Sequence, residues 1–289
     1  MLETFLTESK RFVNWEDAVQ WLREQPDCRD LVQAAYYDDP LLEAADRYWN
    51  SEEWNALRAY LPVQGAHALD VGAGRGIASY ALAKDGFKVT SLEPDGSSLV
   101  GADAIRELAQ VTALPISVTQ EFSERLPFAD GSFEVVYARA VLHHTTDLSA
   151  ACREFFRVLK PGGRLVAIRE HVISRPEDLP VFLKIHPLHK LYGGENAFML
   201  HQYKDAIVSA GFQIASVLAP FDSPINFAPR SLLGLKSEIA ARAGAKVPGV
   251  QFLTNAVLCW TPAWALVRHI LNALDNRPGR LYSFIANRS

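Results

Sequence analysis

Apolar positions follow two alternating patterns from residue 66 onward. Short segments rich in Val, Ile, Leu and Phe alternate with segments in which apolar residues recur every three or four positions. The first pattern is typical of strands, and the second is typical of helices that pack one face against a sheet. This alternation predicts an α/β fold with a parallel, doubly wound sheet. The expected strands are 66–71, 87–92, 116–119, 133–139, 164–173 and 212–218. Of the helices between them, one is expected to begin at Ser97 and another to span 145–163.

The helical pattern stands alone in two other segments. Apolar residues between Trp15 and Leu22 share one helix face, and similar repeats fill the rest of the first sixty residues. A second helical segment follows the sixth expected strand, and the turn Arg277–Arg280 then leads into a last strand, 281–286. The predicted domains are a helical N-terminal cap (1–60), a core (61–220, closed by a strand within 279–289) and a helical insertion (221–278).

The sequence leaves the role of the cap open. It can cover the edge of the sheet as a structural element, or it can close as a lid over a bound ligand. The second interpretation rests on the number of aromatic residues in the cap. These residues are Trp15, Tyr36, Tyr37 and Trp49.

A glycine-rich loop joins the first strand to its helix in the stretch AHALDVGAGRGIASYALA, residues 66–83. Glycine has no Cβ, so this loop can turn tightly and lie close to a ligand, while the first N–H groups of the next helix stay free to face it. A dinucleotide fingerprint would need a glycine where Ile77 stands, which disfavours a nicotinamide cofactor. The loop begins two residues after Asp70, and its glycines are Gly72, Gly74 and Gly76.

Composition narrows the class of partner. Of the 289 residues, 49% are hydrophobic and 21% are charged, and the formal net charge is -4. Such a chain can fill a large core but is not expected to be drawn to nucleic acid or to an anionic membrane. Three cysteines without a Cys-x-x-Cys pattern favour reduced thiols over disulfides or a zinc site.

Two segments bear on localisation. The N-terminal residues include acids and do not have the pattern of a secretion signal. The longest uncharged run, 247–267, is interrupted by polar residues, and we expect a buried helix there. The expected protein is cytoplasmic and has no stable membrane insertion, while its oligomeric state is left open.

Two stretches resemble a known enzyme family. Residues 66–83 are similar to motif I of class I S-adenosylmethionine-dependent methyltransferases. Residues 120–144, QEFSERLPFADGSFEVVYARAVLHH, resemble the small-molecule subgroup known as methyltransferase type 11 through their LPF, SF and LHH motifs. The resemblance implies a Rossmann-like, seven-stranded sheet whose last strand, here 281–286, is antiparallel. It also implies S-adenosyl-L-methionine as cofactor and S-adenosyl-L-homocysteine as product.

The resemblance further implies which residues hold the cofactor. In that family the acid that ends the first strand, here Asp70, and the glycine loop hold the methionine part. The acid that ends the second strand, here Glu93, binds the ribose hydroxyls. Glu93 lies about twenty residues past the glycines, where a neighbouring parallel strand delivers an acid to a ribose. The adenine is then expected beside Pro94 and the two residues that follow it.

One position departs from the family pattern. In the subgroup an acid four residues before the Leu of LPF contacts the adenine, but here that residue is Phe122. We expect Phe122 to stack on the adenine, and the Ser123 backbone and Glu124 to take over the polar contact. Arg139, at the end of the fourth strand, completes the expected cofactor residues.

The acceptor side is predicted from chemistry. Methyl transfer from a sulfonium is an in-line displacement, so the protein aligns donor and acceptor and removes a proton from an oxygen or nitrogen acceptor. Histidine suits proton removal because its unperturbed pKa is ~6.5. We expect His171 to be the base, with Glu195 and His189 orienting the acceptor. His144 is a further candidate, although the His143–His144 pair recurs in the subgroup whatever the acceptor.

The segment 185–196 has other interpretations. It can be a hydrogen-bonded surface loop, or, with His171, it can offer metal ligands through His186, His189 and Glu195. The spacing of these residues fits no zinc pattern, so no metal site is predicted.

The sequence thus predicts an S-adenosylmethionine-dependent methyltransferase that acts on a small polar molecule, with O-methylation favoured over N- or C-methylation. Two alternatives remain from other classes. One is a protein that binds the cofactor without catalysis, and the other is a nicotinamide-dependent oxidoreductase.

Overall fold

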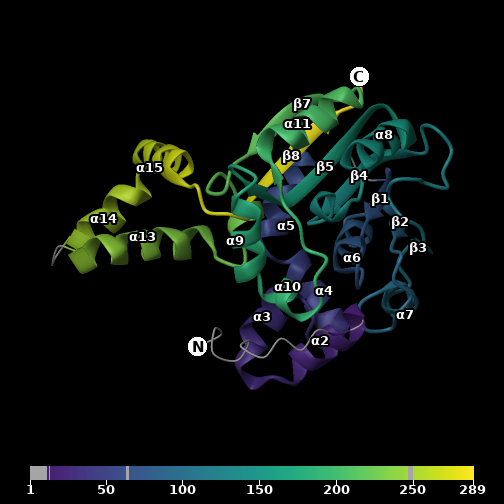
Figure 1. The fold of residues 1–289 in the computed structure, drawn as a ribbon, viewed down its shortest axis with the longest axis horizontal. Coiled ribbons are helices and arrows are strands. Elements are labelled where there is room, and N and C mark those ends of the chain that lie inside the picture. Colours follow the sequence, from purple (N-terminus) through teal and green to yellow (C-terminus); the bar gives the residue numbers. More distant parts are fainter. Residues whose placement is uncertain (1–11, 13, 63–64, 247–249) are drawn as a thin grey trace.

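The computed structural model describes residues 12, 14–62, 65–246 and 250–289, and it places one mixed sheet at the centre of the molecule (Figure 1). The strands are β1 (His67–Val71), β2 (Lys88–Leu92), β3 (Ile116–Thr119), β4 (Phe133–Arg139), β5 (Leu159–Ile173), β6 (Phe198–Met199), β7 (Gln213–Leu218) and β8 (Arg280–Asn287).

The strand order is β3-β2-β1-β4-β5-β8-β7, and the short β6 pairs with β5 outside this path. The pairs that β8 makes with β5 and β7 are antiparallel, and the other pairs are parallel. The Rossmann-like sheet with an antiparallel last strand is therefore confirmed. β6 is an addition that the sequence pattern did not predict, because two residues are too few to show an alternation.

The apolar runs are continuous because helices cover both faces of the sheet. Val135 and Tyr137 of β4 pack in one buried cluster, with the helix that follows the glycine loop. Their neighbours Val136 and Ala138 pack in the cluster on the opposite face. The covering helices are α6 (Ile77–Lys84) and α7 (Ala102–Thr112) on the first face, and α8 (Leu148–Val158) and α11 (Leu200–Ser209) on the second.

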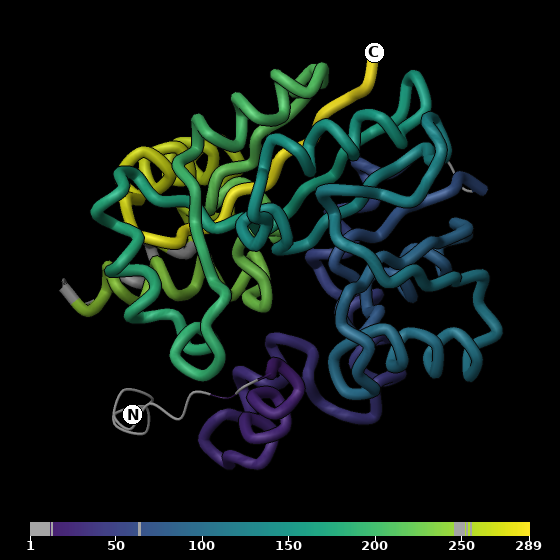
Figure 2. The backbone as a smooth tube through the Cα atoms, turned by 45° about the vertical axis from the view of Figure 1, so that its right-hand side comes forward, coloured from purple at the N-terminus to yellow at the C-terminus, as the bar shows by residue number. Residues whose placement is uncertain are grey.

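The N-terminal helices form two pairs. The second pair, α4 (Leu41–Trp49) and α5 (Glu52–Leu57), packs against the sheet next to α6. The first pair, α2 (Trp15–Glu24) and α3 (Arg29–Ala34), lies at the lower end of the molecule, next to α10 (Pro187–Leu191), and is purple in Figure 2. The N-terminal helices therefore touch both the sheet and the segment that follows β5. The division of the chain into domains stays a prediction.

Between β7 and β8 the chain forms an arm that projects from the body of the molecule (Figure 1). The short helix α12 (Pro224–Phe227) lies against α5 and β8, and three longer helices follow it. They are α13 (Leu232–Lys246), α14 (Val250–Cys259) and α15 (Thr261–Leu274).

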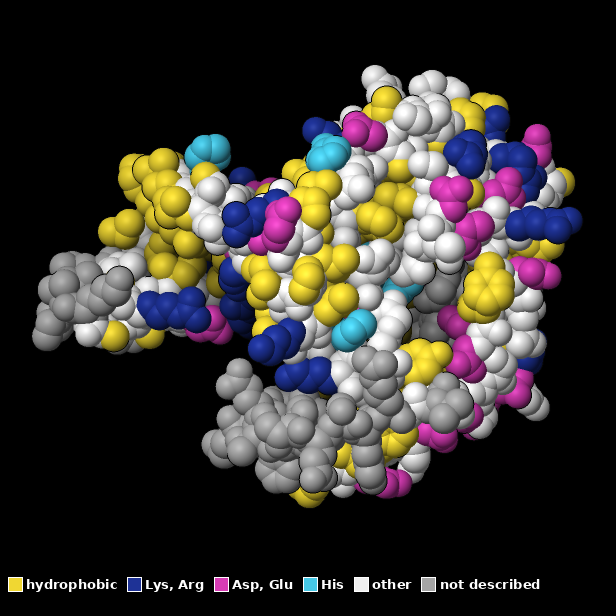
Figure 3. Space-filling view, viewed as in Figure 1, with side chains coloured by type: hydrophobic (Ala, Val, Ile, Leu, Met, Phe, Trp, Pro, Cys, Tyr) yellow, Lys and Arg dark blue, Asp and Glu magenta, His cyan; other side chains and the backbone are white. Residues whose placement is uncertain are grey.

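The prediction of a buried helix over 247–267 is wrong. The described part of this run forms two helices that meet near Trp260, and Phe252, Trp260 and Leu266 are 79%, 67% and 61% exposed. Apolar side chains cover much of the arm in Figure 3. These side chains are exposed because the helices of the arm pack only against one another, in a small cluster that buries one face of each helix. Among the described residues, every helix is too short or too polar to cross a bilayer.

Two element boundaries also differ from the prediction. The helix expected to start at Ser97 starts at Ala102, because Asp95 holds the residues between in a turn. Its carboxylate accepts from the Ser97 N–H at 2.7 Å, and its carbonyl accepts from the Ala102 N–H at 2.7 Å. Such a local side-chain bond competes with helix formation. The helix expected over 145–163 is α8, which ends at Val158, and β5 begins at the next residue, Leu159.

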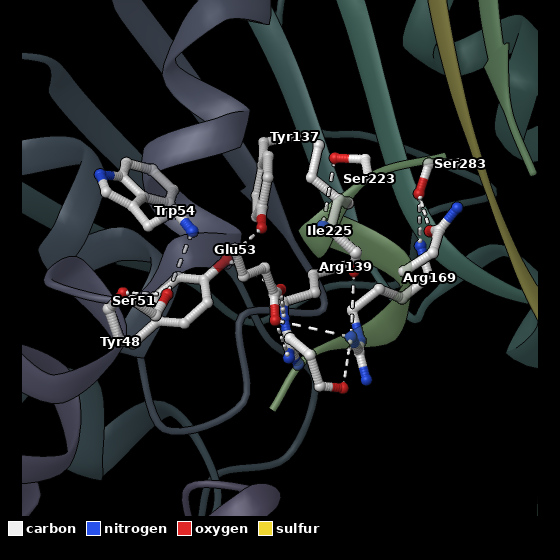
Figure 4. Close-up of polar contacts among 12 residues, drawn as sticks. Tyr48, Ser51, Glu53, Trp54, Tyr137, Arg139, Arg169, Ser223, Ile225 and Ser283 are labelled. Carbon is white, nitrogen blue, oxygen red and sulfur yellow. Dashed lines mark hydrogen bonds and ion pairs between the residues drawn. The ribbon is translucent and has the colours of Figure 1, made fainter. Parts of the chain in front are cut away.

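A buried carboxylate joins α5 to the sheet (Figure 4). Glu53 is 1% exposed and accepts from Nε and Nη2 of Arg139 at 2.7 and 3.2 Å. Nη1 of Arg169 lies 3.6 Å from the same carboxylate. Nearby, the hydroxyls of Tyr48 and Tyr137 lie 2.8 Å apart. Because a buried charge without partners is costly, this network holds α5 in place against β4 and β5.

Arg169 extends the network to the arm. It has a φ of 60° where the pairing of β5 with β8 is irregular. Its Nη1 donates to the carbonyls of Ile225 and Ala228 at 3.0 and 3.2 Å, and its backbone N–H donates to Oγ of Ser283 at 3.1 Å. The cap, the sheet and the start of the arm therefore share one set of polar contacts (Figure 4).

We expect the substitution Glu53→Gln to lower the free energy of unfolding by about 3–5 kcal/mol, because it leaves buried guanidinium groups without a countercharge. As a control, Glu238→Gln removes the exposed ion pair with Arg230, whose atoms lie 3.2 Å apart, and a change below about 1 kcal/mol is expected. Urea unfolding followed by circular dichroism measures both. Equal, small changes in the two variants would contradict this role of Glu53.

Candidate functional site

A cavity of ≈ 730 Å³ opens at the carboxyl ends of β1, β2, β4 and β5. This edge is where open α/β sheets bind their ligands. Residues 34–37 of the N-terminal segment line one side, and residues 192–195 line another. The cavity therefore lies between the sheet, the cap and the segment that follows β5.

The glycine loop forms the floor of the cavity near β1. Gly72, Gly74 and Gly76 have φ values of 60°, 54° and 82°, which favour glycine. A Cβ on Gly72 would lie 2.7 Å from a methyl group of Val141, so the loop passes close to the turn after β4. At Gly74 the nearest atom would be 3.9 Å away. The loop is thus packed at its start and has more room at its middle.

Glu93 ties the glycine loop to the end of β2. One carboxylate oxygen accepts from the Gly74 N–H at 2.7 Å, and the other accepts from the Asp95 N–H at 3.0 Å. The side chain lines the cavity while being only 8% exposed, and burial raises its pKa. Glu93 thus lies in the cavity wall next to Pro94, and its contact with the ribose stays a prediction.

Asp70 lies deeper, beneath the loop. It is 1% exposed, and its carboxylate accepts from the Ser79 hydroxyl at 2.5 Å. Burial raises the pKa of Asp70 to about 7, and the nearby Glu93 charge acts in the same direction. Asp70 lines the cavity, where it can reach a bound ligand. Its contact with the methionine part of the cofactor stays a prediction.

The expected adenine residues Phe122, Ser123 and Glu124 also line the cavity. The Phe122 ring is 69% exposed, which leaves it available for stacking. Glu124 accepts from the Thr146 N–H at 2.8 Å and from the Ser123 hydroxyl at 3.1 Å. These contacts join the loop after β3 to the turn after β4.

Arg139 has a different set of contacts from the one expected. It lines the cavity, but its guanidinium is bound to Glu53 and lies over the rings of Tyr36 and Tyr48. Arg139 thus helps to hold the cap against the sheet. Its contact with the cofactor stays a prediction.

Arg75, which the sequence analysis missed, connects the glycine loop to the cap. It is 6% exposed, its Nη1 donates to the carbonyls of Tyr36 and Asp38 at 3.1 and 3.0 Å, and it forms an ion pair with Asp39. Arg75 occupies a variable position of the Gly-x-Gly-x-Gly motif, so the sequence carried no signal for this role. Through Arg75, the chain that lines one side of the cavity is attached to the cofactor loop.

On the acceptor side, Glu170 of β5 fixes the turn after β4. Its carboxylate accepts from the backbone N–H groups of Val141, Leu142 and His143, each at 3.1 Å. It also lies 2.7 Å from Nδ1 of His143. Burial raises the pKa of Glu170 to about 7, while the three backbone hydrogen bonds oppose this rise. Glu170 is 0% exposed and sits behind the cavity wall rather than in it.

Three of the four expected catalytic residues, His144, His171 and Glu195, line the cavity. Nδ1 of His171 lies 2.9 Å from the Gly279 carbonyl, and Nδ1 of His144 lies 2.9 Å from the Gly194 carbonyl. A carbonyl only accepts, so Nδ1 carries the proton in both rings and Nε2 has the lone pair. Because Glu170 points behind the wall while its neighbour His171 faces the cavity, only His171 of this pair reaches the acceptor side.

His189, the fourth, is not among the cavity residues. Its backbone N–H donates to Nδ1 of His186 at 3.4 Å, and His186 does line the cavity. The structure therefore brings His186 to the site and leaves the His189 side chain outside the lining.

Three imidazoles form a cluster that is held neutral, those of His143, His171 and His186. Burial lowers the pKa of His171 to about 3 and that of His186 to about 3, and it lowers the pKa of His143 well below its usual value. Burial raises the pKa of Glu195 to about 7. Near neutral pH the cluster thus presents uncharged ring nitrogens around one carboxyl group.

Comparisons with known proteins agree with the resemblance seen in the sequence. Residues 69–167 match the family described as a methyltransferase domain. The O-methyltransferase resE from Aspergillus sclerotiorum is 27% identical over 221 residues, which are 73% of this chain and 81% of resE. A demethylmenaquinone methyltransferase from Beutenbergia cavernae is 36% identical over 129 residues, which are 45% of this chain and 50% of that protein. The chain spans about half of the length of several other relatives that it matches.

Among solved structures, a geranyl diphosphate C-methyltransferase from Streptomyces coelicolor A3(2) has the same fold. Its structure is a complex with Mg²⁺, geranyl diphosphate and S-adenosyl-L-homocysteine. The TM-score is 0.58 at 17% identity, over 92% of this chain and 85% of that chain. This likeness confirms the predicted methyltransferase fold. The family match over residues 69–167 confirms S-adenosyl-L-methionine as the cofactor.

We expect Glu93→Ala to weaken the binding of S-adenosyl-L-homocysteine by roughly ten- to a hundred-fold, because a charge-assisted hydrogen bond contributes about 1.5–3 kcal/mol. Isothermal titration calorimetry measures the affinity. Glu107→Ala, at an exposed position of α7, is the control and should bind like the wild type. Wild-type affinity in Glu93→Ala would show that Glu93 does not hold the cofactor.

If the cap closes over the cofactor, residues 29–39 should exchange their amide hydrogens more slowly when S-adenosyl-L-homocysteine is added. The reason is that Tyr36 and Tyr37 line the cavity and Arg75 ties them to the glycine loop. Hydrogen exchange followed by mass spectrometry tests this, with α11 on the far face as an internal reference. Unchanged exchange in residues 29–39 would leave the structural interpretation of the cap.

Proposed function

We propose that this chain, whose residues 69–167 form an S-adenosylmethionine-dependent methyltransferase domain, transfers the methyl group to an oxygen of a small molecule. The acceptor has a hydroxyl at one end and an apolar body. It enters the cavity from the side of the cap and of the segment that follows β5.

The observation that carries this proposal is that donor and acceptor residues line one cavity. The glycine loop (72–76) and Glu93 line it near β1 and β2. His144, His171 and Glu195 line it near β4 and β5. A cofactor held at the first end can present its methyl group to a molecule held at the second. Such alignment of two reactants supplies much of the rate gain in a displacement reaction.

The shape of the acceptor is inferred from two contrasting sides of the cavity. His171 and Glu195 form a polar side. Another part of the lining is aromatic, with the ring of Trp15 5.9 Å from that of Tyr37 and 5.7 Å from that of Tyr192. Pockets of this kind bind molecules that combine an apolar body with a few polar groups. The similarity to resE, an O-methyltransferase by name, supports an oxygen acceptor.

We assign proton removal to His171 and orientation of the acceptor hydroxyl to Glu195. The hydrogen bond of the His171 Nδ1–H to the Gly279 carbonyl leaves the lone pair on Nε2, and the pKa of about 3 keeps this nitrogen unprotonated before the reaction. Nε2 of His171 would take the proton of the acceptor hydroxyl, and the bound cofactor would supply the methyl group to that oxygen and be released as S-adenosyl-L-homocysteine. Glu170 acts through His143, as a positioning residue.

The substitutions His171→Ala and Glu195→Gln should abolish turnover or raise the KM for the acceptor. The affinity for S-adenosyl-L-homocysteine should stay within about two-fold of wild type, because the acceptor contacts are separate from those of the cofactor. A panel of small phenols, catechol included, serves as acceptors, with release of S-adenosyl-L-homocysteine as the readout. His201→Ala, at an exposed histidine of α11, is the matched control.

Two outcomes would contradict the proposal. Full activity of both variants would move the acceptor site away from this cluster. Tight cofactor binding by the wild type without turnover on any phenol would favour a protein that binds the cofactor without this catalysis.

A further inference from the structure

Three potential metal ligands converge at the acceptor end of the cavity. One ligand atom from each of His143, His171 and Glu195 lies within 4.8 Å of the other two. Nε2 of His143 is 3.7 Å from a carboxylate oxygen of Glu195, which is too long for a hydrogen bond. The rings of His143 and His171 meet edge to face, with centroids 4.6 Å apart. The three side chains come from the turn after β4, from β5 and from the segment before β6.

The outer nitrogen of each of these rings is already held by an acceptor. Nδ1 of His143 lies 2.7 Å from the Glu170 carboxylate, and Nδ1 of His171 lies 2.9 Å from the Gly279 carbonyl. Both partners fix the tautomer in which Nε2 has the lone pair. A histidine that binds a metal almost always donates its other N–H to a carboxylate or a backbone carbonyl in this way.

We propose that His143, His171 and Glu195 bind a divalent transition-metal ion of the Zn²⁺, Co²⁺ and Fe²⁺ class at the acceptor end of the cavity. Two imidazole nitrogens and one carboxylate favour such ions over Mg²⁺ and Ca²⁺, which prefer oxygen ligands. Ligands of a tetrahedral site with bonds of about 2.1 Å lie about 3.4 Å apart, so these atoms need to move inward by about one ångström.

A further ring nitrogen is at hand to complete the coordination. Nε2 of His144 lies 3.9 Å from the Glu195 oxygen that faces His143. Nδ1 of His186, 3.7 Å from the other Glu195 oxygen, already accepts from the His189 N–H. A site with three protein ligands keeps a position open for water or substrate. The sequence pattern suggested His171 and Glu195 as possible ligands but not His143, because His143 lies one helix and one strand earlier in the chain and no short spacing links the three residues.

A metal ion here would change how the acceptor loses its proton. An oxygen bound to a divalent ion is more acidic, so a coordinated acceptor hydroxyl would release its proton to water, and His171 would serve as a ligand instead of as the base. This consequence rests on the proposed function, whereas metal binding itself does not.

The test is a metal titration of the full-length protein after dialysis against EDTA. Co²⁺ is the probe, followed by its visible absorption and by calorimetry. We expect one equivalent to bind, and Zn²⁺ to displace it. His143→Ala, His171→Asn and Glu195→Gln should each weaken Co²⁺ binding at least about ten-fold, and Glu170→Gln about ten-fold or more through His143. The exposed histidines supply the control variant His201→Ala/His269→Ala, which should bind Co²⁺ like the wild type.

The outcomes separate this proposal from the proposed function. Retained affinity for S-adenosyl-L-homocysteine shows that each variant is folded. Absence of Co²⁺ binding in the wild type, or equal binding in wild type and His171→Asn, would overturn the metal site, even if methyl transfer to a phenol proceeds. One equivalent of Co²⁺ that is lost in His171→Asn and kept in the control would support the site, even if no phenol is methylated.

Discussion

The acceptor side of the cavity depends on one buried carboxylate, that of Glu170. Removed from water, this group needs several donors, and it finds them in three backbone N–H groups of residues 141–143 and in the ring of His143. The pairing of β5 with β8 is irregular just before Glu170, and such irregularities redirect side chains. Glu170 thus points under the turn after β4, while His171 faces the cavity. One position sets both the shape of that turn and the direction of two histidines.

The parts of the structure that the sequence predicted are those encoded over short distances. The sheet follows from the alternation of apolar runs with helical repeats. The cofactor loop follows from three glycines after Asp70, and Glu93 from its distance to them. A positive φ favours glycine and a buried strand favours a run of apolar residues, so both can be recognised in the sequence. A local turn that competes with a helix has a weaker sequence signal. For this reason the start of α7 was predicted too early.

Contacts between segments that are far apart in the sequence have no such local signal. Arg139 was expected to contact the cofactor, and nothing in the sequence pattern indicated its ion pair with Glu53, 86 positions earlier. Arg75 reaches the chain at Tyr36 and Asp38, and no periodicity of either segment indicates this pairing. The uncharged run in the arm was expected to be buried because apolar residues favour burial, yet burial also requires a partner surface. That surface is decided by topology rather than by composition.

The boundary of the family match separates what similarity explains from what this chain's own residues must explain. The match covers 69–167, so it includes the glycine loop, Glu93 and the turn with His143 and His144. It ends before Glu170, His171 and Glu195, and it starts after the residues of the cap that line the cavity. Because a fold does not fix a reaction, inference from relatives is strongest for the methyl donor. The acceptor has to be inferred from residues that precede and follow the matched segment in the sequence and that line one cavity.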